Sequence, residues 1–156
     1  SIGRKVAELF CALDNRVIGF DPQPDKEWLG KNNVELMSFD ELLAASDVIL
    51  LHIPGNSDNS AIIGRHEIDK LKDGAFLINL ARGGVVDEQA LYDALVARKI
   101  NAAAIDVFSV EPYDGPLCDL ENVILTPHLG SYAKEGKLNM EIDAVRNIIN
   151  ALGNAY

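Results

Sequence analysis

Three side chains that could together move a proton beside a bound carboxylate stand out in this sequence: Arg82, Glu111 and His128. An imidazole titrates near neutral pH, so it can both accept and donate a proton. A neighbouring carboxylate fixes the tautomer of that imidazole and favours its protonated form. A guanidinium binds a carboxylate through two parallel hydrogen bonds. The set therefore predicts chemistry on a small carboxylated substrate.

Each of these residues follows an apolar run that is typical of a buried strand. The runs span 75–78, 102–108 and 123–125, and the three charged residues follow them in that order. In an open parallel sheet, the loops after the carboxyl ends of the strands converge on one crevice, where ligands bind. We therefore expect the three side chains to converge around one pocket, with the carboxylate pointing at the imidazole.

Each residue also has a plain structural interpretation. Arg82 precedes two glycines, as in a turn, Glu111 precedes a proline, as in a solvated turn, and His128 can be a packed loop histidine. Their joint occurrence in this order favours the catalytic interpretation. Of the other histidines, His52 is expected to be structural or cofactor-lining, and His66 to lie on the surface of a helix.

The rest of the chain alternates short β-rich runs with amphipathic segments, the pattern of βαβ units around a parallel sheet. We expect strands or short extended segments at 16–20, 34–37, 47–53, 75–80, 102–107 and 123–125. We expect helices at 2–13, 38–45, 66–71, 88–98 and 132–152, with a Ser38–Glu41 capping box and Asp87 as a helix cap. The predicted fold class is α/β: a Rossmann-type doubly wound parallel sheet that lacks its first strand.

Composition narrows the classes of function. With 156 residues, 48% of them hydrophobic, one core and one domain (1–156) are expected. The net charge of −10 argues against a nucleic-acid partner, and no apolar run approaches the roughly 18 residues of a membrane helix. Cys11 and Cys118 lie far apart without metal-type spacing, so we expect free thiols, no metal site and a cytoplasmic setting.

A candidate cofactor site lies near the start of the chain. Gly3 stands at the beginning of a helix, and Asp21 follows 18 positions later at the end of a strand. In dinucleotide-binding folds such a glycine permits close helix–strand packing, and such an acidic residue accepts hydrogen bonds from the adenosine ribose. The absence of an arginine beside Asp21 favours NAD over NADP. The alternative is that Asp21 and Pro22 only begin a turn.

Five stretches of the chain form a recognisable series of motifs: Ser1–Arg4, Leu51–Pro54, Asn79–Glu88, Asp106–Pro112 and Thr126–Gly130. Together they resemble the D-isomer-specific 2-hydroxyacid dehydrogenases, most nearly the phosphoglycerate dehydrogenase-like members. The resemblance implies an NAD-binding domain that is inserted within a substrate domain. It also implies hydride transfer between NAD and the CH–OH group of a D-2-hydroxy acid, with 3-phosphoglycerate as one candidate, and a homodimer as the intact protein.

The resemblance also assigns roles by position. Arg82 corresponds to the arginine that binds the substrate carboxylate and polarises the carbonyl, His128 to the general acid/base, and Glu111 to its hydrogen-bonded carboxylate. Asp106 corresponds to the residue beside the nicotinamide carboxamide, and Asp21 to the ribose aspartate. The other implied cofactor-binding positions, besides Arg82 and His128 themselves, are Ser1, Ile2, Gly3, Ile53, Pro54, Leu80, Ala81, Gly130 and Ser131.

Two other functions stay open on the sequence: an NAD(H)-sensing binding protein of the corepressor type, which keeps the same three residues, and an inactive cofactor-binding fragment. We expect the 156-residue chain alone to be unable to turn over substrate. In the doubly wound order a strand before Gly3 would lie between strands 16–20 and 47–53. We expect it to come from residues outside this sequence or from a partner chain, or the sheet to be rearranged.

Overall fold

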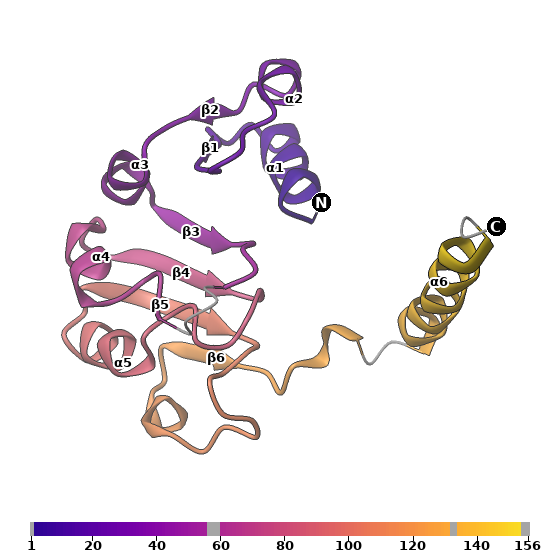
Figure 1. Ribbon diagram of the computed structural model, residues 1–156. Helices are drawn as coiled ribbons and strands as arrows, with labels where there is room; N and C mark the ends of the chain where they lie inside the picture. Colours follow the sequence, from indigo (N-terminus) through magenta and orange to yellow (C-terminus); the bar gives the residue numbers. More distant parts are fainter. Residues whose placement is uncertain (1, 56–59, 132–133, 154–156) are drawn as a thin grey trace.

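The computed structural model describes residues 2–55, 60–131 and 134–153, and it has an α/β architecture (Figure 1). The strands are β1 (Ile18–Gly19), β2 (Glu35–Leu36), β3 (Val48–Leu51), β4 (Ala75–Asn79), β5 (Ile100–Ile105) and β6 (Val123–Leu125). The helices are α1 (Ile2–Ala12), α2 (Lys26–Lys31), α3 (Phe39–Ala45), α4 (Arg65–Lys70), α5 (Glu88–Val96) and α6 (Lys134–Gly153), with short 3-10 turns η1 (Pro116–Asp119) and η2 (Leu129–Ser131).

The strands are parallel and form two separate sheets. Strands β3, β4, β5 and β6 pair in sequence order, and β1 pairs only with β2. Within the described residues, the break falls between β1 and β3, where the doubly wound order places one further strand (Figure 1). The predicted α/β class is confirmed, and the sheet is in two parts.

The main core lies on one face of the four-stranded sheet. Along β3, Ile49 and Leu51 are buried while Val48 is exposed, because successive side chains of a strand point to opposite faces. The buried face packs against α3, α4 and α5, which contribute residues such as Leu43, Ile68 and Leu91 to the core. This packing holds the strands in register, so that the loops after β4, β5 and β6 lie at one edge.

Two helices, α3 and α5, begin at the capping residues that the sequence predicted. The Ser38 amide donates to the Glu41 carboxylate at 3.0 Å, and the Glu41 amide donates back to the Ser38 hydroxyl, which completes the expected capping box of α3. The Asp87 carboxylate accepts a hydrogen bond from the Ala90 amide at 3.0 Å and caps α5. Capping side chains satisfy amides that have no partner within the helix, so they set where a helix begins.

Helix α2 was not predicted, and the contacts that hold it come from α1. Asp25 caps its first turn by accepting from the Trp28 amide at 3.0 Å. The Arg4 guanidinium pairs with Asp25 at 2.9 Å and lies over the Trp28 ring, and the Trp28 indole donates to Glu8. The pair α1–α2 thereby forms one unit with β1 and β2 (Figure 1).

Helix α6 extends away from the rest of the described chain (Figure 1). The described part of this helix begins at Lys134, and the predicted start at residue 132 lies outside the described residues. Its large apolar side chains are exposed; they are Leu138, Met140, Ile142, Val145, Ile148, Ile149 and Leu152. Among the helices that the structure describes, none has both the length and the apolar character needed to cross a membrane.

Candidate active site

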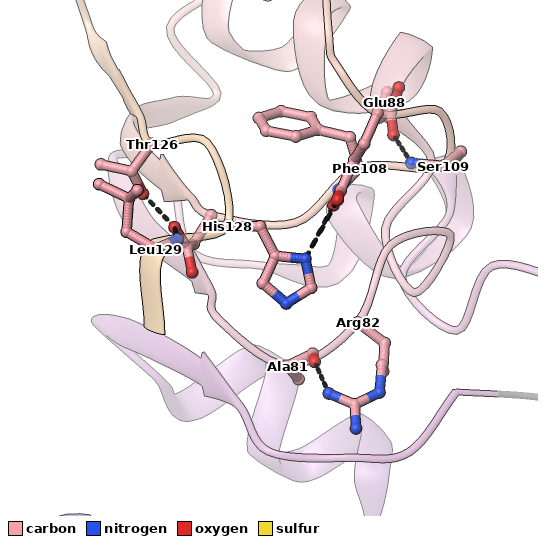
Figure 2. A network of polar contacts seen from close by, with 10 residues as sticks. Ala81, Arg82, Glu88, Phe108, Ser109, Thr126, His128 and Leu129 are labelled. Atoms are coloured by element: carbon pink, nitrogen blue, oxygen red, sulfur yellow. Dashed lines mark hydrogen bonds and ion pairs between the residues drawn. The ribbon is translucent and has the colours of Figure 1, made fainter. Parts of the chain in front are cut away.

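The three residues singled out by the sequence lie on loops at one edge of the sheet. Arg82 follows β4, Glu111 follows β5 and His128 follows β6, and these strands are parallel neighbours. The carboxyl ends of the three strands therefore share one edge, and Figure 2 shows the Arg82 and His128 side chains there. The expected juxtaposition of these loops is what the structure shows.

The imidazole of His128 is paired with the carboxylate of Glu111. His128 Nδ1 lies 3.1 Å from Glu111 Oε2 and 3.2 Å from Oε1. Because a carboxylate can only accept, Nδ1 carries the proton that joins them, and Nε2 is left for exchange with another molecule. The two side chains are 46% and 39% exposed, so the pair is open to solvent on one side.

The Glu111 carboxylate is kept ionised by its surroundings. The Phe108 amide donates to Oε1 at 3.1 Å, and His128 donates from its ring. These two hydrogen bonds, the Phe108 amide first, lower the pKa of Glu111 below its usual value, and the Asp106 carboxylate acts in the opposite direction. A carboxylate with a lowered pKa stays charged across the neutral range, so it can stabilise an imidazolium beside it.

The loop that carries Glu111 is held at two further points. Ser109 donates its amide to the carboxylate of Glu88 in the first turn of α5, at 2.8 Å (Figure 2). The rings of Phe108 and Tyr113 stack with centroids 4.3 Å apart. The carboxylate that orients His128 therefore sits on a braced loop.

The Arg82 loop is organised by a buried asparagine. Asn79 is 2% exposed; its side-chain amide donates to the Arg82 carbonyl at 3.1 Å, and its side-chain oxygen accepts from the Ala81 amide at the same distance. The Arg82 guanidinium donates a hydrogen bond to the Ala81 carbonyl at 2.6 Å (Figure 2). Arg82 is exposed. Arg82 is thus presented to solvent from a fixed backbone.

A glycine allows the Arg82 loop to touch the Glu111 loop. A Cβ atom on Gly83 would overlap the carbonyl group of Phe108 and would lie 3.0 Å from the Ser109 amide nitrogen. Only a residue without a side chain permits this approach. The contact places the backbone of the Arg82 loop directly against the backbone after β5.

The predicted cofactor positions also lie at carboxyl ends of strands or at the start of α1. Asp21 follows β1 and is exposed; its Oδ1 accepts from the Gln23 amide at 2.8 Å, which is the bond of the turn considered above. No hydrogen bond within the described residues engages its Oδ2. Both interpretations of Asp21 are compatible with this geometry, because a turn that uses one oxygen leaves the other for a ribose hydroxyl.

Gly3 packs closely against the loop after β3. A Cβ atom on Gly3 would lie 3.2 Å from the His52 Cβ, so glycine permits the close approach of helix and strand that the sequence suggested. Burial lowers the pKa of His52, which favours a neutral imidazole beside the helix start. Ile2 is the first described residue of α1 and is exposed, whereas Ser1 lies outside the described residues.

The remaining predicted positions are spread along the same edge. Ile53 and Pro54 follow β3, Leu80 and Ala81 follow β4, Asp106 follows β5, and Gly130 and Ser131 lie in η2. Asp106 is bonded to the His128 loop rather than pointing free into solvent. Within the parts of the chain that the structure describes, no group of three His, Cys, Asp or Glu side chains could hold a metal ion.

Sequence reasoning missed the residues that brace the site, namely Asn79, Gly83, Glu88 and Thr126. All four lie inside the motifs quoted above. The signal available for them was their position next to a chemically active residue, and their roles depend on contacts between loops that no spacing within one loop reveals.

Replacing Glu111 by glutamine should lower the rate of a reaction in which His128 donates a proton, and it should move the high-pH limit of that rate to lower pH. The carboxylate, whose pKa is lowered, favours the protonated imidazole, and the neutral amide does not. Since both side chains are partly exposed, the displacement should be about one pH unit or less. The measurement is kcat against pH.

The matched control for this variant is Glu121→Gln, which removes the same charge from an exposed position before β6. It should leave the profile unchanged. A Glu111→Gln protein with the wild-type profile would show that Glu111 does not act on His128.

Comparison with known proteins identifies relatives across the whole chain. Residues 1–130 match the family model described as D-isomer specific 2-hydroxyacid dehydrogenase, NAD binding domain. The chain is 42% identical over 151 residues to a D-3-phosphoglycerate dehydrogenase of Archaeoglobus fulgidus, covering 96% of this chain and 29% of the relative. It is 39% identical to a hydroxypyruvate reductase of Thermotoga maritima, covering 98% of this chain and 50% of that protein.

Solved structures agree with these sequence relatives. A glyoxylate reductase from Paecilomyes thermophila superposes with a TM-score of 0.89 at 36% identity, covering 96% of this chain and 46% of that one. A D-lactate dehydrogenase from Aquifex aeolicus, solved in complex with NAD and lactic acid, gives a TM-score of 0.85 at 30% identity, covering 98% of this chain and 51% of that one. The chain thus spans half or less of the length of the curated relatives named here. It belongs to the D-isomer-specific 2-hydroxyacid dehydrogenase family, and it matches the NAD-binding domain of that family.

Proposed function

We propose that this chain is the NAD-binding part of an oxidoreductase that transfers a hydride between the nicotinamide cofactor and the CH–OH group of a D-2-hydroxy acid. The observation that carries the proposal is the His128–Glu111 pair on the loops after β6 and β5, beside the Arg82 loop after β4. Membership of the family supports the same reaction class.

The residues at the carboxyl edge fit a dinucleotide. Gly3 allows α1 to begin close to the β3 loop, and Asp21 follows β1 with a carboxylate oxygen left for a ribose hydroxyl. Sheets of this kind bind dinucleotides outside the carboxyl ends of their strands. NAD, when bound, supplies the hydride acceptor, and the protein supplies position, charge and the proton path.

The side chains divide the remaining work between them. In keto-acid reduction, the Arg82 guanidinium binds the substrate carboxylate and draws electron density from the carbonyl. The protonated His128 donates its Nε2 proton to the carbonyl oxygen as that oxygen gains negative charge. Glu111 stays charged and holds Nδ1–H, so the ring keeps its orientation while it loses and regains the proton. In the oxidation of a hydroxy acid the proton moves back to Nε2.

An activity measurement tests this function. The complete gene product is assayed for NADH oxidation with hydroxypyruvate, pyruvate and glyoxylate, and for NAD reduction with 3-phosphoglycerate. Saturable turnover with at least one of these acids is expected. A gene product that binds NADH and turns over none of them would favour the NAD(H)-sensing alternative.

NAD should be preferred over NADP. The Asp21 carboxylate can accept a ribose hydroxyl and would repel a 2′-phosphate. We expect kcat/KM with NADH to exceed that with NADPH about tenfold or more, the value of one charge-assisted hydrogen bond. Asp21→Ala should lower the ratio of kcat/KM with NADH to kcat/KM with NADPH.

The control for this prediction is Asp14→Asn, because Asp14 lies in the turn between α1 and β1 and also has an exposed carboxylate. The Asp14→Asn variant should keep the wild-type ratio of kcat/KM with NADH to kcat/KM with NADPH. Equal or better kinetics of the wild-type protein with NADPH would overturn the role given to Asp21.

We propose that residues 1–156 form one NAD-binding domain and that turnover also needs a substrate-binding domain. The support is that the chain covers 29% and 50% of two relatives, and that the sheet is divided between β1 and β3. The test compares NADH oxidation by this chain with that of the complete gene product at equal concentration. Equal turnover by the two would contradict the proposal.

We propose that the complete gene product is a homodimer in the cytoplasm, with a small acid rather than nucleic acid or a membrane as its partner. The exposed apolar side chains of α6 support association, because few monomers expose so many. The free thiols Cys11 and Cys118 fit a reducing compartment. Sedimentation analysis tests the homodimer, and cell fractionation tests the cytoplasmic setting.

A further inference from the structure

The backbone of His128 adopts a conformation that its surroundings must maintain. Its φ is +55°, in the left-handed region that residues with a side chain rarely adopt. Such a conformation persists at a functional position only when neighbouring contacts hold it. The His128 amide donates to the Thr126 carbonyl at 3.0 Å, which closes a tight turn around Pro127. This bond lies within the turn, so it does not fix the turn relative to Glu111.

One carboxylate oxygen ties both ends of that turn to the strand next to it. Asp106 Oδ1 accepts the Thr126 hydroxyl at 2.5 Å and the Leu129 amide at 3.2 Å (Figure 2 shows Thr126 and Leu129 at this contact). Thr126 is also anchored through its amide, which donates to the Ile105 carbonyl at 3.0 Å and extends the pairing of β5 with β6. The residues before and after Pro127–His128 therefore meet at a single atom.

The Thr126 hydroxyl is the contact that orients Asp106. The charged Glu111, on the same loop, repels the Asp106 carboxylate, as the opposing effect of Asp106 on the pKa of Glu111 indicates. Asp106 is half-buried and makes one hydrogen bond to a backbone amide across the turn. The hydroxyl supplies the second and shorter bond, and it comes from a residue whose own backbone is fixed to β5.

We propose that Thr126 is a positioning residue for His128: its hydroxyl fixes the Asp106 carboxylate, and Asp106 in turn holds the turn that presents the imidazole. Glu111 then sets the direction of the ring, and Thr126 with Asp106 sets the place of the backbone that carries it. The inference rests on the proposed function of His128 as the proton donor. Thr126 itself touches neither substrate nor proton.

Two substitutions separate the hydroxyl from the shape of the side chain. Thr126→Val keeps the volume and the β-branch and removes the hydroxyl, whereas Thr126→Ser keeps the hydroxyl. In the complete gene product, with saturating NADH and hydroxypyruvate as the varied substrate, Thr126→Val should lower kcat about tenfold or more and leave KM within about twofold, the size of effect expected for one lost hydrogen bond to a charged group. Thr126→Ser should retain most of the wild-type kcat.

A second measurement does not depend on activity. Hydrogen exchange followed by mass spectrometry should show faster exchange in the segment 126–131 of Thr126→Val than in Thr126→Ser, because the Leu129 amide loses a fixed acceptor. The segment around the Ser38 capping box serves as an internal reference and should not change.

The outcomes are distinguishable. Wild-type kcat and wild-type exchange in Thr126→Val would overturn the positioning role, and so would equal losses in the valine and serine variants, since the effect would then not come from the hydroxyl. If the wild-type gene product reduces none of the keto acids, the proposed function fails; the exchange result then still decides whether Thr126 holds the turn.

Discussion

Replacing His128 by asparagine should lower the kcat of the complete gene product by about 10²–10⁴-fold, the usual contribution of a general acid/base. The imidazole is the only group in the described site that combines a free ring nitrogen with a charged partner on the other side. Without it, the carbonyl oxygen loses the proton donor that the site holds in place.

Asparagine is chosen because it tolerates the backbone conformation of residue 128. The φ of +55° at His128 disfavours alanine, whereas asparagine adopts the left-handed region more readily than most residues. The variant should therefore keep the wild-type unfolding temperature. His66→Asn is the control, since His66 is exposed on α4, and it should keep full turnover. A His128→Asn protein within tenfold of the wild-type kcat would remove His128 from the proton path.

Elements whose signals are local were predicted from the sequence. Strand β6 has the predicted bounds, and α3 and α5 begin at the predicted capping residues Ser38 and Asp87. In each case the signal and the structure depend on the same few neighbouring residues. Strands β1 to β4 are shorter than predicted, because apolar runs continue into the loops that line the site; Ile53 and Leu80 are examples. Strand β5 has the predicted length but begins two residues earlier, at Ile100.

Elements that depend on contacts across the chain were not predicted. Helix α2 has six residues, none of them buried, and it is held by Arg4 and Glu8 of α1. Its own sequence gives one signal, the Asp25 cap. The division of the sheet was anticipated only through the order of strands in a doubly wound fold, which is a rule about neighbours and not a pattern in the residues.

The same distinction applies to the site. The active groups Arg82, Glu111 and His128 could be named from residue type and order, because their chemistry is distinctive. The residues that hold them could not, because Asn79 and Thr126 act through hydrogen bonds to other loops. Side chains that support a site have ordinary types, and only the geometry shows what they do.

Replacing Gly83 by alanine should lower activity, although Gly83 itself has no side chain that could take part in the reaction. The added Cβ would overlap the Phe108 carbonyl, and both partners are backbone, so no side-chain rotation relieves the overlap. The Arg82 loop and the Glu111 loop must then separate. A displacement of about 1 Å can cost about 10²-fold in rate when reacting groups must be aligned, so kcat/KM should fall by about that factor or more.

The stability of the protein should fall as well, by about 1–3 kcal/mol, because the two loops are packed on the core through Phe108. The control is Gly30→Ala in α2, where no atom lies within 4 Å of the added Cβ and the helical backbone favours alanine. Kinetics and urea unfolding of the two variants are compared in the complete gene product. If Gly83→Ala matched Gly30→Ala in both, the contact between the two loops would not set the distance of Arg82 from His128, and the arrangement that joins the substrate-binding cation to the proton donor would have to come from elsewhere in the protein.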